Sequence, residues 1–353
     1  MKTIARIACV PGMTVAEDIV DKNGKMIVSS GSQLTEAHLA KMARHDIMAV
    51  TVHEKIDYAT THYEKIRFSE SFEAFEKIYQ KNLAIYKTLL LDFVNYHATF
   101  NIDHLMDVFD DIYKAAETPE LLLDYLYNMI PSEDDLTHSH CLNSALIAGV
   151  FGEWLGLSNS DRINYIQTGF VYDIGKLRIP DSILWKPGKL DDSEMALLRR
   201  HTTMGYDLVK NLALNVHIPL ATLQHHERND GSGYPDGLMA DRIDPYAKLI
   251  AIVDTYEAMT SARIYRQSLH PFQVIAHYEE TNGFVRYDRD ALTTVLSHIA
   301  HTQIGRNVRL SDGRNAEVLS INENALSHPN VRLTDNGAEM DLSKFGLSIA
   351  AIF

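Results

Sequence analysis

The spacing of apolar residues divides this chain of 353 residues into segments of different periodicity. Residues 1 to about 55 alternate short apolar runs with turn residues, and Asp-Lys-Asn-Gly at 21–24 is typical of a hairpin turn. Residues 34–42 instead have helical spacing, with Thr35 as a candidate N-cap. The pattern predicts a small α+β module at 1–55. Because this module holds no catalytic pattern, a docking or regulatory role is favoured.

From residue 69 to residue 129 the apolar residues recur every three or four positions, which indicates amphipathic helices. The stripes are rich in aromatic residues: Phe72, Phe75, Ile78 and Tyr79, then Leu83, Tyr86, Leu89, Leu90 and Phe93, then Leu105, Val108, Ile112 and Tyr113. Such stripes are far more often helix-packing core than a ligand site. We expect residues 56–130 to form a helical connector, whose surface is a candidate for homodimer formation.

After a polar break at 131–135 the helical pattern returns. We expect helices at residues 138–155, 161–174, 191–212, 218–226, 247–261, 271–278 and 290–300. Asp191 and Glu194 mark the third of these with a capping box, and a glycine-rich loop at 229–237 follows the fourth. From residue 304 short strands alternate with turns, which predicts a small β-barrel or an added sheet.

The predicted fold class is therefore mainly α, with an all-helical domain at 131–303 and a β-rich subdomain at 304–353. Hydrophobic residues make up 46% of the chain, yet no apolar run reaches the roughly 18–20 residues of a membrane span. A formal net charge of −14 excludes broad binding to nucleic-acid polymers. Two distant cysteines, Cys9 and Cys141, give no disulfide framework and fit a reducing cytoplasm, and the N-terminal residues lack a signal-peptide pattern.

Residues of metal-binding type recur on separate predicted helices of the central domain. They are His140, Asp173, His201, His225, His226 and Asp254. Imidazole and carboxylate are the ligands of Zn, Mn and Fe sites, and a hydrolytic two-metal site needs about six of them. A lone histidine on an apolar helix is usually a core residue, but this many groups in one region favour a metal site. Asp173 suits a bridging position, because an unpaired charge in an apolar helix is costly.

Lys176 lies about one helical turn after Asp173. It could neutralise a phosphate oxygen in the same site, or it could simply form an ion pair with Asp173. The loop at 229–237 offers backbone N–H groups to a phosphate or a base, although taken alone it is only a turn.

These residues and their neighbours together carry a specific resemblance. The motifs are, in chain order, Thr137-x-x-His140, Tyr172-Asp173-Ile174-Gly175-Lys176, Lys186-Pro187-Gly188-Lys189-Leu190, Arg200-His201, His225-His226-Glu227, Asp230-Gly231-Ser232-Gly233-Tyr234-Pro235, Ala251-Ile252-Val253-Asp254 and Arg263-x-x-Arg266. Their order and spacing over residues 131–300, about half of the chain, resemble the HD-GYP family. Members of that family are all-helical metallohydrolases that cut the bacterial second messenger cyclic di-GMP to linear pGpG or to GMP.

The resemblance implies a role for each matching position. The ligands of one or two transition-metal ions, Fe or Mn, would be His140, Asp173, His201, His225, His226 and Asp254. Asp173 would bridge two ions, and a hydroxide between them would attack the phosphorus. Lys176 would be catalytic with Asp173 and would stabilise the phosphate. Substrate contacts would come from the loop residues Gly233 and Tyr234 and from Arg263 and Arg266.

Two positions depart from the family pattern. The histidine of the His-Asp pair is Tyr172 here, and ionising a phenol at pH 7 costs on the order of 4 kcal/mol from a reference pKa near 10. A ferric ion could offset that cost with Tyr172 as a ligand, whereas a weaker divalent site would not, so one metal position depends on Tyr172. Leu136 stands where some members have a glutamate ligand, which argues against a third ion.

Three functions follow as hypotheses. The favoured one is a cyclic di-GMP phosphodiesterase whose site tolerates Tyr172, because every other matching position is intact. The alternative is a catalytically impaired domain that senses cyclic di-GMP or binds a partner protein. A weaker option is the hydrolysis of another phosphoester by the same site.

Overall fold

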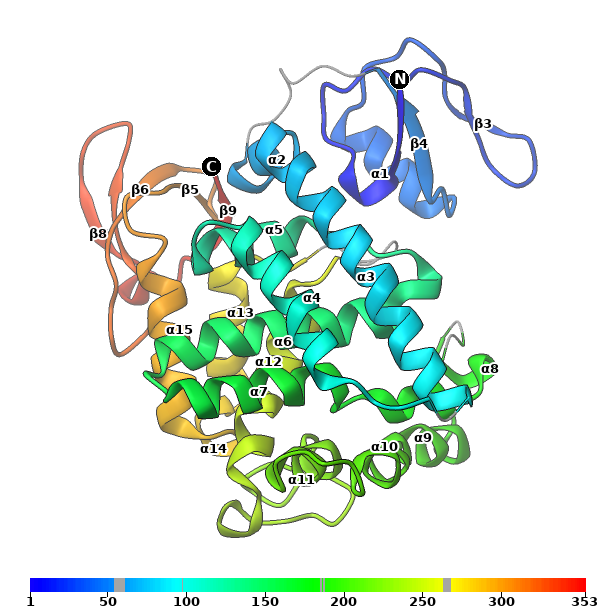
Figure 1. The fold of residues 1–353 in the computed structure, drawn as a ribbon. Helices are drawn as coiled ribbons and strands as arrows, with labels where there is room; N and C mark the ends of the chain where they lie inside the picture. Colours follow the sequence, from blue (N-terminus) through cyan, green and yellow to red (C-terminus); the bar gives the residue numbers. More distant parts are fainter. Residues whose placement is uncertain (54–60, 97, 185, 187, 263–267) are drawn as a thin grey trace.

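Helix α6 (Leu136–Trp154) forms the centre of the fold (Figure 1). The structure is a computed structural model, which describes residues 1–353 except 54–60, 97, 185, 187 and 263–267. All residues from 137 to 152 are buried, and a helix without a polar face belongs in a core. Helix α7 (Asn159–Val171) packs along α6 and is capped by Ser158, whose hydroxyl accepts a hydrogen bond from the backbone N–H of Asp161.

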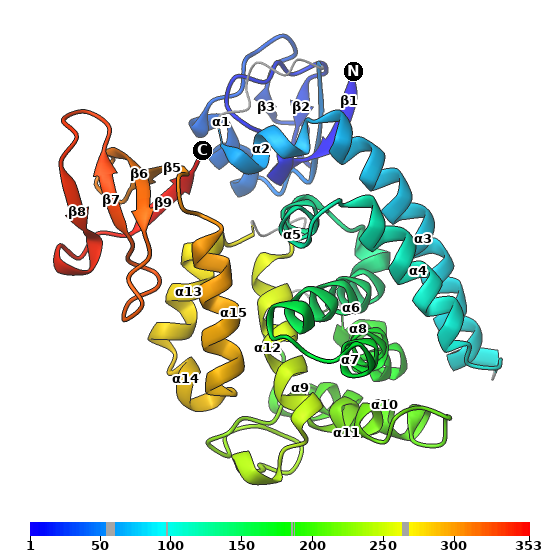
Figure 2. The ribbon, with the colours of Figure 1, turned by 60° about the vertical axis from the view of Figure 1, so that its left-hand side comes forward.

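Further helices surround the α6–α7 pair. They are α8 (Asp181–Leu184), α9 (Asp192–Arg199), α10 (His201–Val209), α11 (His217–Gln224), α12 (Pro245–Thr260), α13 (Pro271–Glu280), α14 (Gly283–Arg286) and α15 (Arg289–His301), with the 3-10 turns η2 (Glu133–Asp135), η3 (Ile174–Arg178) and η4 (Ala240–Arg242). Figure 2 shows α12 between α6 and the α13–α15 pair. The mainly α fold class is thereby confirmed, whereas the predicted domain boundaries stay predictions.

The predicted connector consists of α2 (His62–Arg67), α3 (Glu70–Tyr96), α4 (Ile102–Ala115) and α5 (Pro119–Asn128). Helices α3 and α4 lie against α6, and their apolar stripes belong to the same hydrophobic core as the central helices. Ile78 is an exception: it was expected on the buried stripe but is 37% exposed. The aromatic stripes are therefore intramolecular core.

The N-terminal module has a core of its own, built around Met13, Val15 and Met42. Its elements are β1 (Lys2–Ala5), η1 (Arg6–Ala8), β2 (Ile19–Val20), β3 (Met26–Val28), α1 (Glu36–Arg44) and β4 (Ala49–Val52). Strand β1 pairs antiparallel with β4, and β2 forms the expected hairpin with β3. The hydroxyl of Thr35 caps α1 by accepting a hydrogen bond from the N–H of His38, as predicted.

The C-terminal segment forms an open five-stranded antiparallel sheet in the order β8-β7-β6-β5-β9. Its elements are β5 (Asn307–Leu310), β6 (Asn315–Ser320), β7 (Asn330–Leu333), β8 (Glu339–Asp341), η5 (Leu342–Lys344) and β9 (Ile349–Ile352). Val308 lies opposite Ala316 on one side and Ile352 on the other, and all three side chains are buried. The sequence did not predict β8, because this short edge strand has no apolar alternation.

Three predicted helices end earlier than expected. The helix predicted at 191–212 is two helices, α9 and α10, which meet at Arg200; the capping box of Asp191 and Glu194 is present. Helices α7 and α11 end at Val171 and Gln224, so the candidate ligands that follow them lie just beyond helix ends. Among the described helices, none combines the length and the apolar character that a membrane crossing requires.

Candidate metal centre

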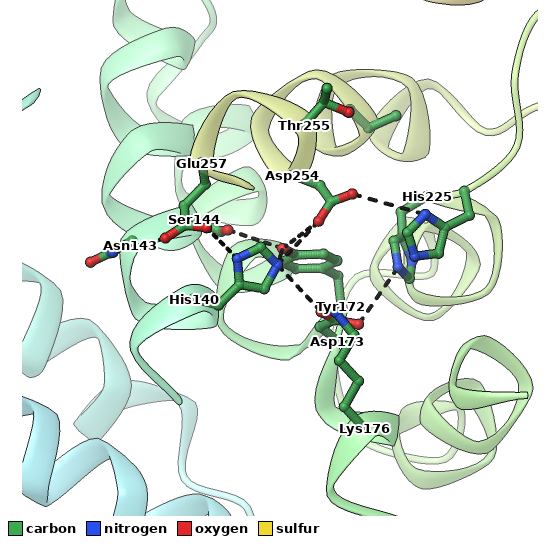
Figure 3. Close-up of polar contacts among 12 residues, drawn as sticks. His140, Asn143, Ser144, Tyr172, Asp173, Lys176, His225, Asp254, Thr255 and Glu257 are labelled. Carbon is green, nitrogen blue, oxygen red and sulfur yellow. Dashed lines mark hydrogen bonds and ion pairs between the residues drawn. The ribbon is translucent and has the colours of Figure 1, made fainter. Parts of the chain in front are cut away.

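Asp173 lies at the middle of the site and is fully buried (Figure 3). Its Oδ1 is 3.3 Å from His201 Nε2 and 3.8 Å from His225 Nε2, while its Oδ2 is 3.3 Å from His140 Nε2. Among the described residues, neither carboxylate oxygen has a hydrogen-bond partner of normal geometry. Burial raises the pKa of Asp173, but Lys176 and the histidines outweigh burial and hold this pKa well below its usual range. A buried carboxylate with both oxygens directed at imidazole nitrogens suits a bridging metal ligand.

One half of the site, the three-histidine half, consists of His201, His225, His226 and the Oδ1 of Asp173. The Nδ1 of His201 donates a hydrogen bond to the carbonyl of Leu198 at 2.7 Å, and the Nδ1 of His225 donates to that of Thr222 at 3.0 Å.

Because a carbonyl oxygen can only accept, each Nδ1 of these two rings carries the proton. The two Nε2 atoms lie 3.3 Å apart. Burial lowers the pKa of all three imidazoles, that of His225 to about 4. The rings are thus neutral, and the Nε2 lone pairs of His201 and His225 face each other. Residues in this state fit a metal ion without rearrangement of protons.

The other half, the Tyr172 half, consists of His140, Asp254, Tyr172 and the Oδ2 of Asp173. His140 Nε2 lies 3.1 Å from Asp254 Oδ1, and the Tyr172 hydroxyl lies 2.6 Å from that nitrogen and 3.2 Å from that oxygen (Figure 3). Burial and the charges of Asp254 and Asp173 raise the pKa of Tyr172 well above its ordinary value. The neutral hydroxyl therefore contacts the same donor atoms that an ion would need.

The protonation of His140 differs from that of the other histidines. Burial lowers its pKa, but the carboxylates of Glu257, Asp173 and Asp254 outweigh burial and raise this pKa well above the ordinary value. Its Nδ1 forms a very short contact with Glu257 Oε2. The ring of His140 is held between carboxylates and the Tyr172 hydroxyl.

The glycine-rich loop lies next to the three-histidine half. The ring of Tyr234 stacks on that of His226 with centroids 4.6 Å apart, and the guanidinium of Arg199 lies over the Tyr234 ring at 4.9 Å. The buried carboxylate of Glu227 shapes the loop by accepting hydrogen bonds from the backbone N–H groups of residues 236, 237 and 238. Gly233 packs so closely that a β-carbon there would clash with the backbone of Glu227.

Lys176 forms an ion pair with Asp173, which is the simpler of its two predicted roles. Burial lowers the pKa of Lys176, but Asp173 and Asp254 outweigh burial and raise it. Gly175 explains why His201 lies so near, because a β-carbon at Gly175 would overlap the carbonyl oxygen of His201. Only glycine lets η3 approach α10 this closely.

Comparison with known proteins agrees with this geometry. Residues 124–291 match the HD domain family. The chain is 39% identical over 158 residues to the cyclic di-GMP phosphodiesterase response regulator RpfG of Xanthomonas campestris pv. campestris. The aligned region covers 44% of this chain and 42% of that protein. It is 31% identical over 232 residues to the cyclic di-GMP phosphodiesterase PA4108 of Pseudomonas aeruginosa, covering 65% of this chain and 55% of that one.

The fold is similar to a solved structure, Bd1817, an HDG"Y"P protein from Bdellovibrio bacteriovorus, with a TM-score of 0.51 and 13% identity over 84% of this chain and 99% of that one. Residues 124–291 are thus similar to HD domains, and the two relatives agree with the resemblance to the HD-GYP family. HD domains are metal-dependent hydrolases, and the described residues of this chain include two candidate metal-binding clusters. The chain spans about half the length of the first two relatives.

The structure brings together most of the site residues that the sequence predicted. His140, Asp173, His201, His225, His226 and Asp254 converge on one site, with Tyr172 among them. Asp173 lies after α7 and not within it, which corrects the predicted helical position. Gly233 and Tyr234 lie beside the three-histidine half, whereas Arg263 and Arg266 lie outside the described residues. The assigned roles stay predictions.

Sequence reasoning missed a series of hydrogen-bonded residues that starts at Glu257, the carboxylate beside His140. Glu257 accepts a hydrogen bond from Asn143 Nδ2 at 3.0 Å, and Asn143 Oδ1 accepts one from the Tyr79 hydroxyl of α3 at 2.7 Å. Glu257 lies three residues after Asp254 on an almost wholly buried helix, so its acidic side chain there was a usable signal. Asn143 follows His140 with the same spacing. Arg199 gave no such signal, because its contact depends on the fold of the loop.

Proposed function

We propose that this chain is a metal-dependent phosphodiesterase that hydrolyses cyclic di-GMP to linear pGpG or to GMP. The observation that carries the proposal is the three-histidine half. Two neutral imidazoles direct their Nε2 lone pairs at each other, 3.3 Å apart, and at an oxygen of the buried Asp173. Backbone carbonyls hold both rings in this tautomer, which is how metal-binding histidines are commonly oriented.

Hydrolysis adds water across one phosphodiester bond: a bond forms between the water oxygen and phosphorus, the bond from phosphorus to the 3′ oxygen breaks, and that oxygen takes a proton. His201, His225, His226 and Asp173 would hold the ion, which would supply Lewis-acid polarisation of the phosphate. We assign Lys176 to the neutralisation of phosphate charge, because its ammonium group lies beside Asp173. Asp173 would hold both the ion and Lys176 in place.

Tyr234 and Arg199 together offer a surface for a purine base. His226 stacks on the Tyr234 ring and the guanidinium of Arg199 lies over that ring at 4.9 Å, so a base would stack on the outer face of the guanidinium. Gly233, Arg263 and Arg266 complete the proposed substrate contacts, the arginines through phosphate or guanine. For the ion, imidazole with carboxylate suits Fe or Mn, and we propose one of these two metals.

Cyclic di-GMP is the first substrate to test, and a second cyclic dinucleotide belongs beside it. One relative, 40% identical over 143 residues that cover 40% of this chain and 33% of that protein, is the 3'3'-cGAMP-specific phosphodiesterase 1 of Vibrio cholerae. Both dinucleotides contain the same ring of two phosphodiesters. The proposed chemistry therefore applies to either one, and base contacts would decide between them.

A second function is favoured by one observation, the contacts of Tyr172. In the Tyr172 half a hydroxyl contacts two of the donor atoms, His140 Nε2 and Asp254 Oδ1, which fits a domain that binds cyclic di-GMP, or a partner protein, without cutting it. The test must therefore measure binding and turnover separately.

The experiment uses the full chain, loaded with Fe(II) or Mn(II) under reducing conditions and incubated with cyclic di-GMP or 3'3'-cGAMP. Products are separated by chromatography, and binding is measured by calorimetry on the same preparation. The proposal expects linear product with the wild type and at least a 100-fold loss in His225→Ala, because that ring is part of the proposed ion site. Binding without product from either dinucleotide would support the sensor and overturn the enzyme.

Two further expectations stay proposals. A homodimer through the connector would have to use side chains of α3 that are exposed, such as Ile78 and Tyr96, because the aromatic stripes are buried within the chain. A cytoplasmic location is supported by Cys9 and Cys141, which are both free and buried.

A further inference from the structure

The hydroxyl of Tyr172 stands among the donor atoms of its half of the site. It lies 2.6 Å from His140 Nε2, 3.2 Å from Asp254 Oδ1 and 3.0 Å from the hydroxyl of Ser144. The side chain has no exposed surface, so water does not compete for these contacts. A hydroxyl offers one proton and two lone pairs, and three polar partners within 3.2 Å use that capacity fully.

Each of these contacts competes with a metal bond. An imidazole nitrogen has one position in the ring plane, which holds either a proton, a hydrogen bond from a donor, or an ion. The Tyr172 hydroxyl is the nearest of these groups to His140 Nε2, at 2.6 Å against 3.1 Å for Asp254 Oδ1 and 3.3 Å for Asp173 Oδ2. An ion on His140 would therefore require this hydrogen bond to break.

The length of the tyrosine side chain explains the difference from a histidine at this position. A phenol oxygen reaches further from the backbone than an imidazole nitrogen does, by roughly the 2 Å of one metal–nitrogen bond. A histidine at position 172 would stop short and leave room for an ion between itself and His140. The Tyr172 oxygen instead reaches His140 and Asp254 directly.

Neighbouring groups hold the Tyr172 ring in this place. Its backbone N–H donates to the carbonyl of Thr168, and its ring meets that of His225 edge to face with centroids 4.9 Å apart. The carbonyl of Phe170, two residues earlier, accepts a hydrogen bond from the Tyr86 hydroxyl of α3 at 2.5 Å. With backbone and ring both fixed, the hydroxyl has little freedom to withdraw from the site.

The three-histidine half has the opposite arrangement. Its Nδ1 protons point outward to the carbonyls of Leu198 and Thr222, and Tyr172 makes no hydrogen bond to His201 or His225 among the described contacts. The Nε2 atoms that face inward carry lone pairs only, and a cation would satisfy them.

We infer that this chain binds one metal ion, on His201, His225, His226 and Asp173, and that the Tyr172 hydroxyl takes the place of a second ion by joining His140 to Asp254. The inference rests on the metal dependence proposed above, but it concerns the number and place of the ions and not turnover. Tyr172 is then a positioning residue that keeps the second half assembled. A phosphodiesterase of this kind would act with a single ion.

The test is the metal content of the full chain after anaerobic loading with Mn(II) or Fe(II) and removal of loosely bound metal. Elemental analysis should give one ion per chain for the wild type, one for His140→Ala, and a loss of that ion in His201→Ala. Tyr172→His should raise the count to two, because it shortens the side chain and supplies a ligand. Ser144→Ala serves as a folding control that removes only a hydroxyl partner of Tyr172, and it should keep one ion.

Two results would overturn the inference. One is two ions in the wild type that fall to one in His140→Ala. The other is a visible charge-transfer band that develops when the iron-loaded protein is oxidised to Fe(III) with hydrogen peroxide and that is missing in Tyr172→Phe, since this band would make Tyr172 a phenolate ligand. A wild type with one ion and no turnover leaves the inference standing while the proposed function fails, and circular dichroism of every variant verifies that it is folded.

Discussion

The two halves of the site contain similar residue types and share Asp173, yet their protons lie in different places. In the three-histidine half, His201 and His225 direct their protons outward to backbone carbonyls and turn lone pairs inward. In the Tyr172 half, a hydroxyl lies inside the group of donor atoms, where it donates to Asp254 Oδ1 and lies 2.6 Å from His140 Nε2. Ligand-type residues at the right spacing therefore do not by themselves make a metal site; the direction of their protons decides.

The largest expected effect comes from removing one imidazole from each half in turn and comparing the two variants. His225→Ala should abolish the tightly bound ion and lower turnover by more than about 100-fold, which exceeds the loss expected for an outer partner. His140→Ala should keep the ion, because in the wild type His140 Nε2 contacts the Tyr172 hydroxyl and is not among the ligands proposed for that ion. Metal content and cyclic di-GMP hydrolysis are measured on the same preparations. Equal loss of the ion in both variants would erase the distinction between the halves.

A second comparison concerns the loop beside the three-histidine half. In Gly233→Ala the added β-carbon would clash with the backbone of Glu227, so the loop must shift and Tyr234 loses its stacking on His226. The KM for cyclic di-GMP should rise about tenfold, the equivalent of about 1.4 kcal/mol of binding, while the ion count stays the same.

Asp236→Ala is the matched control for that loop, because the side chain is exposed and only its backbone N–H contacts Glu227. Its KM should stay near that of the wild type. If Gly233→Ala instead loses the ion with no separate effect on KM, the loop acts by supporting the ion site and not by contacting substrate.

Glu257 offers a test that depends on which residue stands at position 172. In the wild type, Glu257→Gln should leave the ion count unchanged, because the imidazole that Glu257 contacts is that of His140, in the Tyr172 half. In the Tyr172→His background the same change should weaken the second ion by about 10–100-fold, the usual effect of losing an outer carboxylate partner. Metal titrations of the four proteins give the comparison. Weakening of the ion in the wild type would place that ion on His140.

Much of the fold could be predicted from the sequence, because long periodic segments and helix caps indicate local structure. Helix α6, the Thr35 cap and the capping box at Asp191 are where the pattern placed them. The pattern did not predict the helix ends at Val171 and Gln224. Tertiary contacts, such as the packing of Gly175 on α10, decide where these helices stop. Strand β8 was missed since its stability comes from pairing with β7.

The site was predicted in part for a similar reason. Residue types and spacing identified the six candidate ligands, and the resemblance to the HD-GYP family identified the departure at Tyr172. They could not show how Tyr172 is used, because its hydrogen bonds join α6, the end of α7 and α12, which are distant in sequence. The chain from Tyr79 through Asn143 to Glu257 likewise exists only once α3 packs against α6.

The prediction with the smallest consequence for the site concerns the free energy of unfolding and a buried histidine outside the site. Burial lowers the pKa of His270 to about 4, as it does for His225, but among the described residues the Nε2 of His270 contacts the carbonyl of Ile349 and no site residue. The unfolded chain, with a pKa near 6.5, binds more protons between pH 6.5 and pH 4, so His270 makes the free energy of unfolding fall as the pH is lowered through this window.

His270→Gln should remove up to about 3 kcal/mol of that acid destabilisation, as judged from the difference between the two pKa values. Urea unfolding at pH 7 and pH 4.5 measures it, and the ion count at pH 7 should be unchanged. An unaltered pH dependence would show that His270 is protonated equally in both states.

The most direct test of the difference between the halves is to locate the ions. Crystals of the wild type grown with Mn(II) can be measured with X-rays near the Mn absorption edge, and an anomalous difference map shows each ion in place. We predict one peak per chain, bound by His201, His225, His226 and Asp173, with the Tyr172 hydroxyl still on His140. A second peak of similar height between His140 and Asp254 would contradict this result.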